Sequence, residues 1–144
     1  MAYRKYPFLT VEVDELNSTI IMDWNGTFNS AQFREAVKDC MDIVATYKLR
    51  YWLANSSKID LIQPEDQTWT SKVLLPGLSE MGVKKVAIII PENLYNHMAI
   101  AAIMVHGKED TTFDFQYFVK KEEAINWFSQ SASSDVAQQE EKMH

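Results

Sequence analysis

Several residue types that mark particular protein classes are scarce in this chain of 144 residues. Its single cysteine, Cys40, excludes an intrachain disulfide and therefore the disulfide-stapled secreted domains. Its four glycines do not form a phosphate-binding, glycine-rich loop. The longest apolar run, Met98–Val105, is far shorter than the about 20 residues that a membrane helix needs. The first residues also lack the apolar segment of a secretory signal, so we expect a cytoplasmic protein without a membrane span.

Positive charge is also in short supply. The 14 Lys and Arg residues face 20 Asp and Glu residues, which gives a net charge of −6. Nucleic-acid binding draws most of its affinity from cationic side chains on phosphates, so this balance argues against a nucleic-acid partner. Hydrophobic residues make up 47% of the chain. A single domain of this length buries about 68–70% of its unfolded surface, which is enough for a core.

The pattern of apolar residues predicts strands that alternate with helices after an opening hairpin. We expect strands at Phe8–Val13, Thr19–Trp24, Tyr51–Ala54, Lys85–Ile90 and Phe113–Val119. We expect helices after Asn29 or Ser30, from Pro64 to Gly82 with a bend at Pro76–Gly77, over Leu94–His106 and over Glu122–Phe128. The order β-β-α-β-α-β-α-β-α predicts an α/β fold with a mixed five-stranded sheet. Residues 1–128 would form one domain, and the polar residues 129–144 a disordered tail.

Spaced landmarks along residues 9–128 resemble a known family. They are Asp23-Trp24-Asn25-Gly26, Phe33, Trp52-Leu53-Ala54-Asn55, Pro64-Glu65-Asp66-Gln67, Gly82-Val83-Lys84-Lys85-Val86-Ala87 and Glu123-Ala124-x-x-Trp127. Together they resemble the SpoIIAA-like, or STAS-like, small bacterial domains. The resemblance implies helices mainly on one face of the sheet and a non-catalytic binding or regulatory module acting through protein contacts. The better-known relatives are anti-sigma-factor antagonists, and some cousins bind small apolar or lipid-like ligands.

In the antagonist branch of that family, a serine at the start of the helix after the third strand is phosphorylated. Here that helix begins at Gln63-Pro64-Glu65-Asp66, which contains no hydroxyl group. The nearest serines, Ser56 and Ser57, follow the predicted third strand and are the candidate phosphorylation sites. The alternative is that Asn55, Ser56 and Ser57 bond backbone groups where the chain leaves the sheet. The acidic residues Glu65 and Asp66 suit the first turn of a helix, where the dipole favours negative charge.

The segment Leu94–His106 is apolar nearly all round from Met98 to Val105, so it cannot lie half in water as an isolated helix. Three interpretations stay open: plain core packing, a homodimer contact, or one wall of a pocket for a small apolar or lipid-like ligand. The predicted pocket lining is Trp24, Trp52, Tyr95, Met98 and Met104. The predicted dimer contacts are Ile100 and Ile103.

Catalytic and metal-binding patterns are missing from the sequence. His97 and His106 lack a carboxylate or cysteine at ligand spacing, and no nucleophile–base motif is visible. We therefore expect no enzyme activity, no metal and no cofactor. We expect Asp23 to bond the turn at Asn25–Gly26. The expected partners are a second copy of the chain, an unidentified protein and, alternatively, a small apolar ligand.

Overall fold

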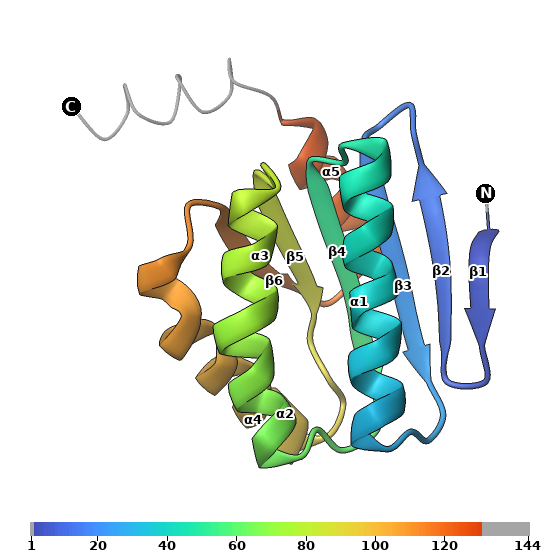
Figure 1. Ribbon diagram of the computed structural model, residues 1–144. Helices are drawn as coiled ribbons and strands as arrows, with labels where there is room; N and C mark the ends of the chain where they lie inside the picture. The colour runs from blue at the N-terminus through green and yellow to red at the C-terminus, as the bar shows by residue number, and fades with distance from the viewer. Residues whose placement is uncertain (1, 131–144) are drawn as a thin grey trace.

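The computed structural model describes residues 2–130 and has an α/β architecture built on a single mixed sheet (Figure 1). The strands are β1 (Ala2–Tyr6), β2 (Leu9–Asp14), β3 (Thr19–Asn25), β4 (Tyr51–Lys58), β5 (Lys85–Ile89) and β6 (Asp114–Phe118). The helices are α1 (Ser30–Tyr47), α2 (Pro64–Trp69), the π-helical turn η1 (Thr70–Leu74), α3 (Leu75–Glu80), α4 (Leu94–Gly107), the 3₁₀ turn η2 (Lys108–Asp110) and α5 (Lys121–Ser129). The strands lie side by side in chain order, from β1 to β6.

The sheet has six strands, so the predicted number of five was wrong. The additional strand, β1, pairs antiparallel with β2 at the edge of the sheet. It carries the charged residues Arg4 and Lys5, which are exposed. Charged side chains are common on edge strands and mask the apolar alternation that identifies a strand in a sequence. The predicted tail begins inside α5 at Ser129, and residues 131–144 lie outside the described part of the chain.

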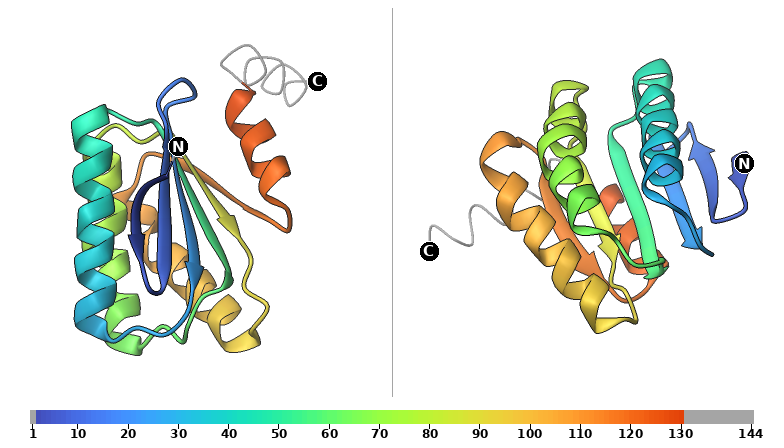
Figure 2. Two further views of the ribbon diagram at one scale, coloured as in Figure 1. Left: turned by 90° about the vertical axis from the view of Figure 1, so that its right-hand side faces the viewer. Right: turned by 60° about the horizontal axis from the view of Figure 1, so that its bottom comes forward.

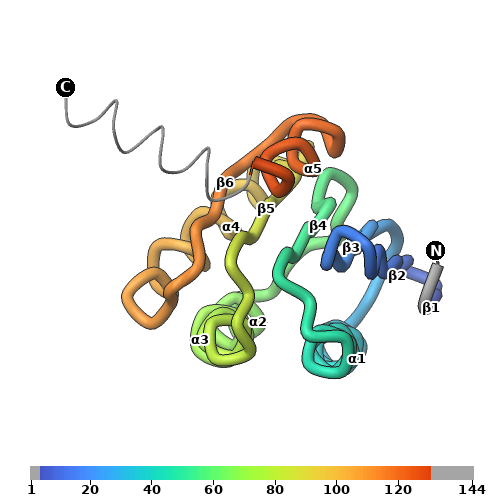
Figure 3. The backbone as a smooth tube through the Cα atoms, turned by 90° about the horizontal axis from the view of Figure 1, so that it is seen from above, coloured from blue at the N-terminus to red at the C-terminus, as the bar shows by residue number. Residues whose placement is uncertain are grey.

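Two layers of helices cover the sheet unequally. Strands β3 to β6 run parallel, and α1, the α2–η1–α3 segment and α4 connect them. Figures 2 and 3 show α1, α2 and α3 on one side of the sheet and α5 on the other. Helix α4 packs into the same core as α1 and α3, through Ile100, Ile103 and Met104. The prediction that helices lie mainly on one face is therefore confirmed for this general arrangement.

Strict alternation along the strands separates two apolar cores. On β4, Trp52 points into the large core beneath α1–α4, whereas Leu53 belongs to the small core beneath α5. The small core also contains Ala124 and Phe128 of α5. Buried Lys85 extends from β5 to the end of α5, and its Nζ donates to the carbonyls of Trp127 and Gln130 at 3.0 and 2.8 Å. A cation at a helix C-terminus satisfies carbonyls that have no partner within the helix.

Helix α1 begins with the predicted cap. Asn29 accepts from the backbone N–H of Gln32, and the Gln32 side chain accepts in return from the backbone N–H of Asn29. This reciprocal capping box satisfies two backbone donors at the helix start. Further along α1, Cys40 is fully buried, and this burial raises the pKa of its thiol to about 12. This environment suits a packing thiol rather than a reactive one.

The second helical segment starts at Pro64 as predicted, but its irregularity lies elsewhere. The chain stays helical through Pro76, which occupies the first turn of α3, so the expected bend at Pro76–Gly77 was wrong. The irregular part is η1, where the backbone N–H of Leu75 donates to Thr70 in a wide π turn. Because proline cannot donate to a preceding carbonyl, it is tolerated where a new helical segment begins. The segment ends at Gly82, whose φ of 90° is readily available to glycine.

Strand β4 is longer than predicted. It continues past Ala54 to Lys58, because Asp23 and Asn25 of β3 pair with Asn55 and Lys58. Ser56 and Ser57 are therefore strand residues, and the prediction that the chain leaves the sheet at Asn55 was wrong. Their side chains point to opposite faces of the sheet, since neighbouring residues of a strand alternate. This extension brings Ser56 beneath the helices.

Candidate functional site

A pocket of about 80 Å³ lies between the sheet and the helices of the large core. Its floor consists of residues from β3, β4 and β5, and its walls come from α1, the α2–η1–α3 segment, the loop before α2, and α4. Nearly all lining side chains are aliphatic or aromatic, and Ser56 and Thr70 provide the hydroxyl groups. None of the described residues that line the pocket is ionisable.

The pocket exists because β4 carries small side chains at its centre. The β4 residues that face the helices are Trp52, Ala54 and Ser56, and all three line the pocket. The large indole of Trp52 is followed by a methyl group and a hydroxymethyl group, which leave space under the helices. On the helical side, the π turn contributes Thr70 and Leu74 to the lining. Single π turns are frequent at functional sites, because they widen a helix locally.

Three of the five side chains predicted for the ligand pocket line it: Trp24, Trp52 and Met104. The other two, Tyr95 and Met98, lie on the outer side of α4 and are 47% and 65% exposed. The Tyr95 hydroxyl donates to the carbonyl of Ile62 at 3.4 Å, which holds this side chain against the loop before α2. Sequence reasoning chose the correct helix for one wall but could not determine its rotation about its own axis.

The predicted dimer contacts, Ile100 and Ile103, are 7% and 5% exposed and line the same pocket. Their side chains therefore contact the chain's own core. The outer face of α4 carries Leu94, Tyr95, Met98 and Val105 instead, each between 47% and 71% exposed. A contact between copies of the chain through α4 would have to use these exposed side chains.

The two candidate phosphorylation sites have very different surroundings. Ser56 is 3% exposed and lines the pocket, and among the described residues no side chain or backbone group hydrogen-bonds to its hydroxyl. Ser57 is half-buried on the opposite face, where its hydroxyl donates to Asn55 at 2.9 Å. The folded chain therefore does not present Ser56 at its surface. Phosphorylation of Ser57 stays a prediction.

Asn55 belongs to a polar cluster on the α5 face of the sheet. Its amide donates to Asp23 at 2.8 Å, and Lys121 at the start of α5 lies 3.1 Å from the same carboxylate. Asp23 therefore joins β3 to β4 and α5, and its predicted bond to the turn at Asn25–Gly26 was wrong. The cluster is fully paired, so its contacts serve to fix α5 on the sheet.

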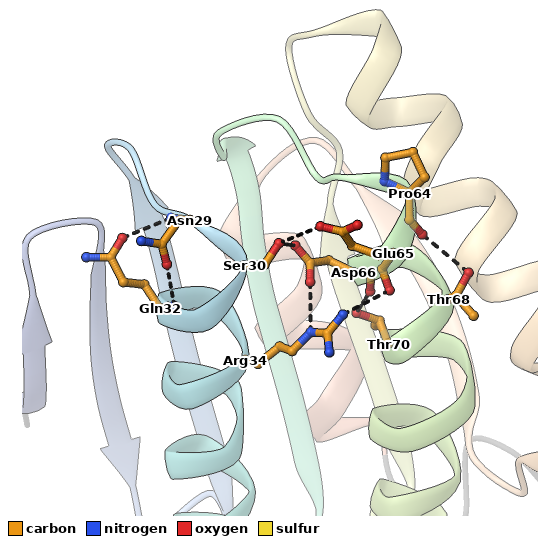
Figure 4. A network of polar contacts seen from close by, with 9 residues as sticks. All are labelled: Asn29, Ser30, Gln32, Arg34, Pro64, Glu65, Asp66, Thr68 and Thr70. Atoms are coloured by element: carbon orange, nitrogen blue, oxygen red, sulfur yellow. Dashed lines mark hydrogen bonds and ion pairs between the residues drawn. The ribbon is translucent and has the colours of Figure 1, made fainter.

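A second polar network joins α1 to α2 next to the pocket (Figure 4). Asp66 is 1% exposed, and its carboxylate accepts from Arg34 at 2.9 Å and from Ser30 at 2.7 Å. The hydroxyl of Thr70, which lines the pocket, donates to the backbone carbonyl of Asp66 at 2.7 Å. Glu65 also accepts from Ser30. Because Glu65 and Asp66 are bonded to α1, their arrangement is explained by helix docking and does not require an acid–base role.

Buried Asn96 fixes the loop that closes the pocket at its other end. Its side-chain oxygen accepts from the backbone N–H of Ile62, and its amide donates to the carbonyls of Ile59 and Asp60. Ile59 and Ile62 line the pocket. One fully bonded amide of α4 thus positions two apolar lining residues.

The described residues contain no group of three or more His, Cys, Asp or Glu side chains placed to hold a metal ion. Within residues 2–130, no helix combines the length and the hydropathy needed to cross a membrane. Comparisons of the chain with protein-family models, with curated proteins and with solved structures found no match. The resemblance to SpoIIAA-like domains therefore stays a prediction that depends on the residues quoted above.

Replacing Arg34 by Met should lower the free energy of unfolding by about 1–3 kcal/mol, because the buried Asp66 carboxylate loses its cation. Urea unfolding followed by circular dichroism measures this loss. The control is Lys38→Met, an exposed position on the same helix, for which we expect a change within about 0.5 kcal/mol. Equal effects of the two substitutions would show that the Arg34–Asp66 pair does not join the helices.

Proposed function

We propose that this chain is a non-catalytic, STAS-like binding module that holds a small apolar molecule in the pocket between its sheet and α1–α4. The observation that supports this function is the pocket itself, lined by Trp24, Trp52 and Met104 as the sequence predicted for a ligand site. Apolar pockets with few polar groups are the usual form of small-molecule sites. The absence of ionisable side chains from the described lining removes the acids, bases and charged nucleophiles on which most enzymes depend.

The volume of the pocket limits the size of the ligand. A cavity of about 150 Å³ in another protein admits benzene, so the 80 Å³ found here suits a molecule of a few carbon atoms. The walls include Met22 and Met104, whose unbranched side chains adapt easily to different contents. A ligand of four or five carbon atoms is about as large as benzene and needs more space than this, so its entry requires rotation of these methionines.

Filling the pocket should abolish binding without unfolding the chain. The substitution Ala54→Leu places additional carbon atoms beside Trp52 and Ser56. We expect wild type to bind 2-methylbutane and Ala54→Leu to bind it at least about tenfold more weakly, because ligand and side chain compete for one volume. Titrations followed by backbone amide NMR shifts measure both affinities.

The control for this experiment is Ala45→Leu, which adds the same atoms at an exposed position of α1 and should leave binding unchanged. The amide spectrum of each variant reports whether the fold is kept. If wild type shows no saturable shifts, or if Ala54→Leu binds as well as wild type, the pocket is not a binding site.

The outer face of α4 favours a second function, contact with another protein. Leu94, Tyr95, Met98 and Val105 recur at helical spacing, and all are exposed. Segment 94–105 contains no Asp, Glu, Lys or Arg, so a surface that binds it needs no complementary charged groups. A second copy of the chain meets that requirement, and we propose a homodimer through this face. The opposite side of the same helix lines the pocket, so a ligand and a partner would contact one element.

We expect wild type to sediment at about twice the 16.6 kDa mass of one chain. The substitution Met98→Glu places a charge on the outer face of α4 and should reduce the mass to that of one chain while the circular dichroism spectrum is unchanged.

The matched variant is Ile103→Glu on the buried side of the same helix, which should unfold the chain because it introduces an unpaired charge into the core. A wild-type chain that sediments as a monomer throughout the micromolar range would contradict the dimer. A Met98→Glu variant that remains dimeric would place the interface elsewhere.

A further inference from the structure

We propose that the ligand of this pocket is a neutral molecule with one hydroxyl or carbonyl oxygen, which hydrogen-bonds to the hydroxyl of Ser56. This inference depends on the proposed function, because it identifies the chemical class of the molecule in the same pocket. The group that carries it is a single buried polar side chain in an otherwise apolar lining.

Ser56 is 3% exposed, lines the pocket and has no hydrogen-bond partner for its hydroxyl in the part of the chain that the structure describes. Buried polar side chains nearly always have a partner, so an unbonded hydroxyl facing a pocket indicates that its partner comes from outside the chain. Among the described residues, every buried side-chain oxygen or nitrogen that solvent cannot reach has a hydrogen-bond partner. The Ser56 hydroxyl is therefore reachable from the space inside the pocket.

The neighbouring positions show that this arrangement is not a general feature of the strand. Ser57 has a partner, since its hydroxyl donates to Asn55. The other hydroxyl of the lining, that of Thr70, donates to the carbonyl of Asp66 within the helix. Ser56 thus differs from both nearby hydroxyl groups, one on the opposite face of the sheet and one in the same pocket lining.

The remaining lining determines which functional group suits the ligand. None of the described lining residues is ionisable, so a carboxylate or an ammonium group would be buried without a counter-charge, which is strongly unfavourable. The Ser56 hydroxyl can donate to an oxygen or accept from a hydroxyl group, which favours a ligand that brings one uncharged oxygen. Short-chain alcohols and ketones meet this requirement.

Two molecules of nearly equal size distinguish the contribution of the hydrogen bond to the affinity from that of the apolar contacts. Butan-2-ol has a hydroxyl group where 2-methylbutane has a methyl group. In Ser56→Ala, the affinity for butan-2-ol should fall about 3- to 10-fold, which corresponds to one hydrogen bond, whereas the affinity for 2-methylbutane should stay the same or rise. Ser57→Ala is the matched control and should change neither. Amide NMR titrations of the full chain measure all six affinities.

The possible results distinguish this inference from the proposed function. The selective loss of butan-2-ol binding in Ser56→Ala supports both. If wild type binds both molecules and Ser56→Ala loses affinity for neither, or for both alike, Ser56 is not the anchor, while the pocket remains a ligand site. If wild type binds neither molecule, the proposed function fails, and the inference fails with it. The amide spectrum of Ser56→Ala confirms in each case that the variant is folded.

Discussion

The alternation of side chains along β4 is the constraint on which the rest of the structure depends. This strand lies within the parallel part of the sheet and is covered on both faces. Leu53 on one face packs under α5, and Trp52 on the other packs under the large helical layer. A shift of one residue in its register would turn every side chain of β4 to the opposite face of the sheet. Each core would then receive the side chains that now pack in the other. The same alternation places Ala54 and Ser56 under the helices and thereby creates the pocket.

Helix α4 shows how one apolar element serves two surfaces. Its buried side closes the pocket with Ile100, Ile103 and Met104, and its amide side chain at Asn96 fixes the adjoining loop. Gly107 at its end allows a close approach to α3, since a Cβ atom there would clash with the side chain of Leu75. The exposed side of the helix stays apolar. The pocket and the exposed apolar face are thus separated by the width of a single helix.

Most of the architecture is predictable from local patterns in the sequence, because strands and helices that bury one face must repeat with period 2 or 3.6. The start of α1 after Asn29, the start of α2 at Pro64 and the closing helix α5 are examples. Strand β1 was missed because its charged residues hide the alternation. The extension of β4 was missed because Asn55 and Ser57 are typical of turns, and only pairing with β3 shows that they continue the strand.

The site was predictable to a smaller extent, for a physical reason. The sequence identified Trp24, Trp52 and Met104 of the lining but not Met22 or Phe33. The rotation of α4, which excludes Met98 and includes Ile100, depends on tertiary contacts. The central feature of the pocket is missing bulk at Ala54, and small residues are not conspicuous in a sequence. A signal was nevertheless present in the sequence. Once β4 is extended, one of its faces carries a large side chain at position 52 and small side chains at positions 54 and 56, which leaves space beneath the helices.

The measurement that tests the pocket most directly is the response of backbone amides to dissolved xenon, a small apolar atom that enters apolar cavities. We expect saturable shifts concentrated at residues 54–56 of β4 and 100–104 of α4, which surround the pocket. Shifts confined to the exposed residues of α4, or no saturable shift at all, would contradict it.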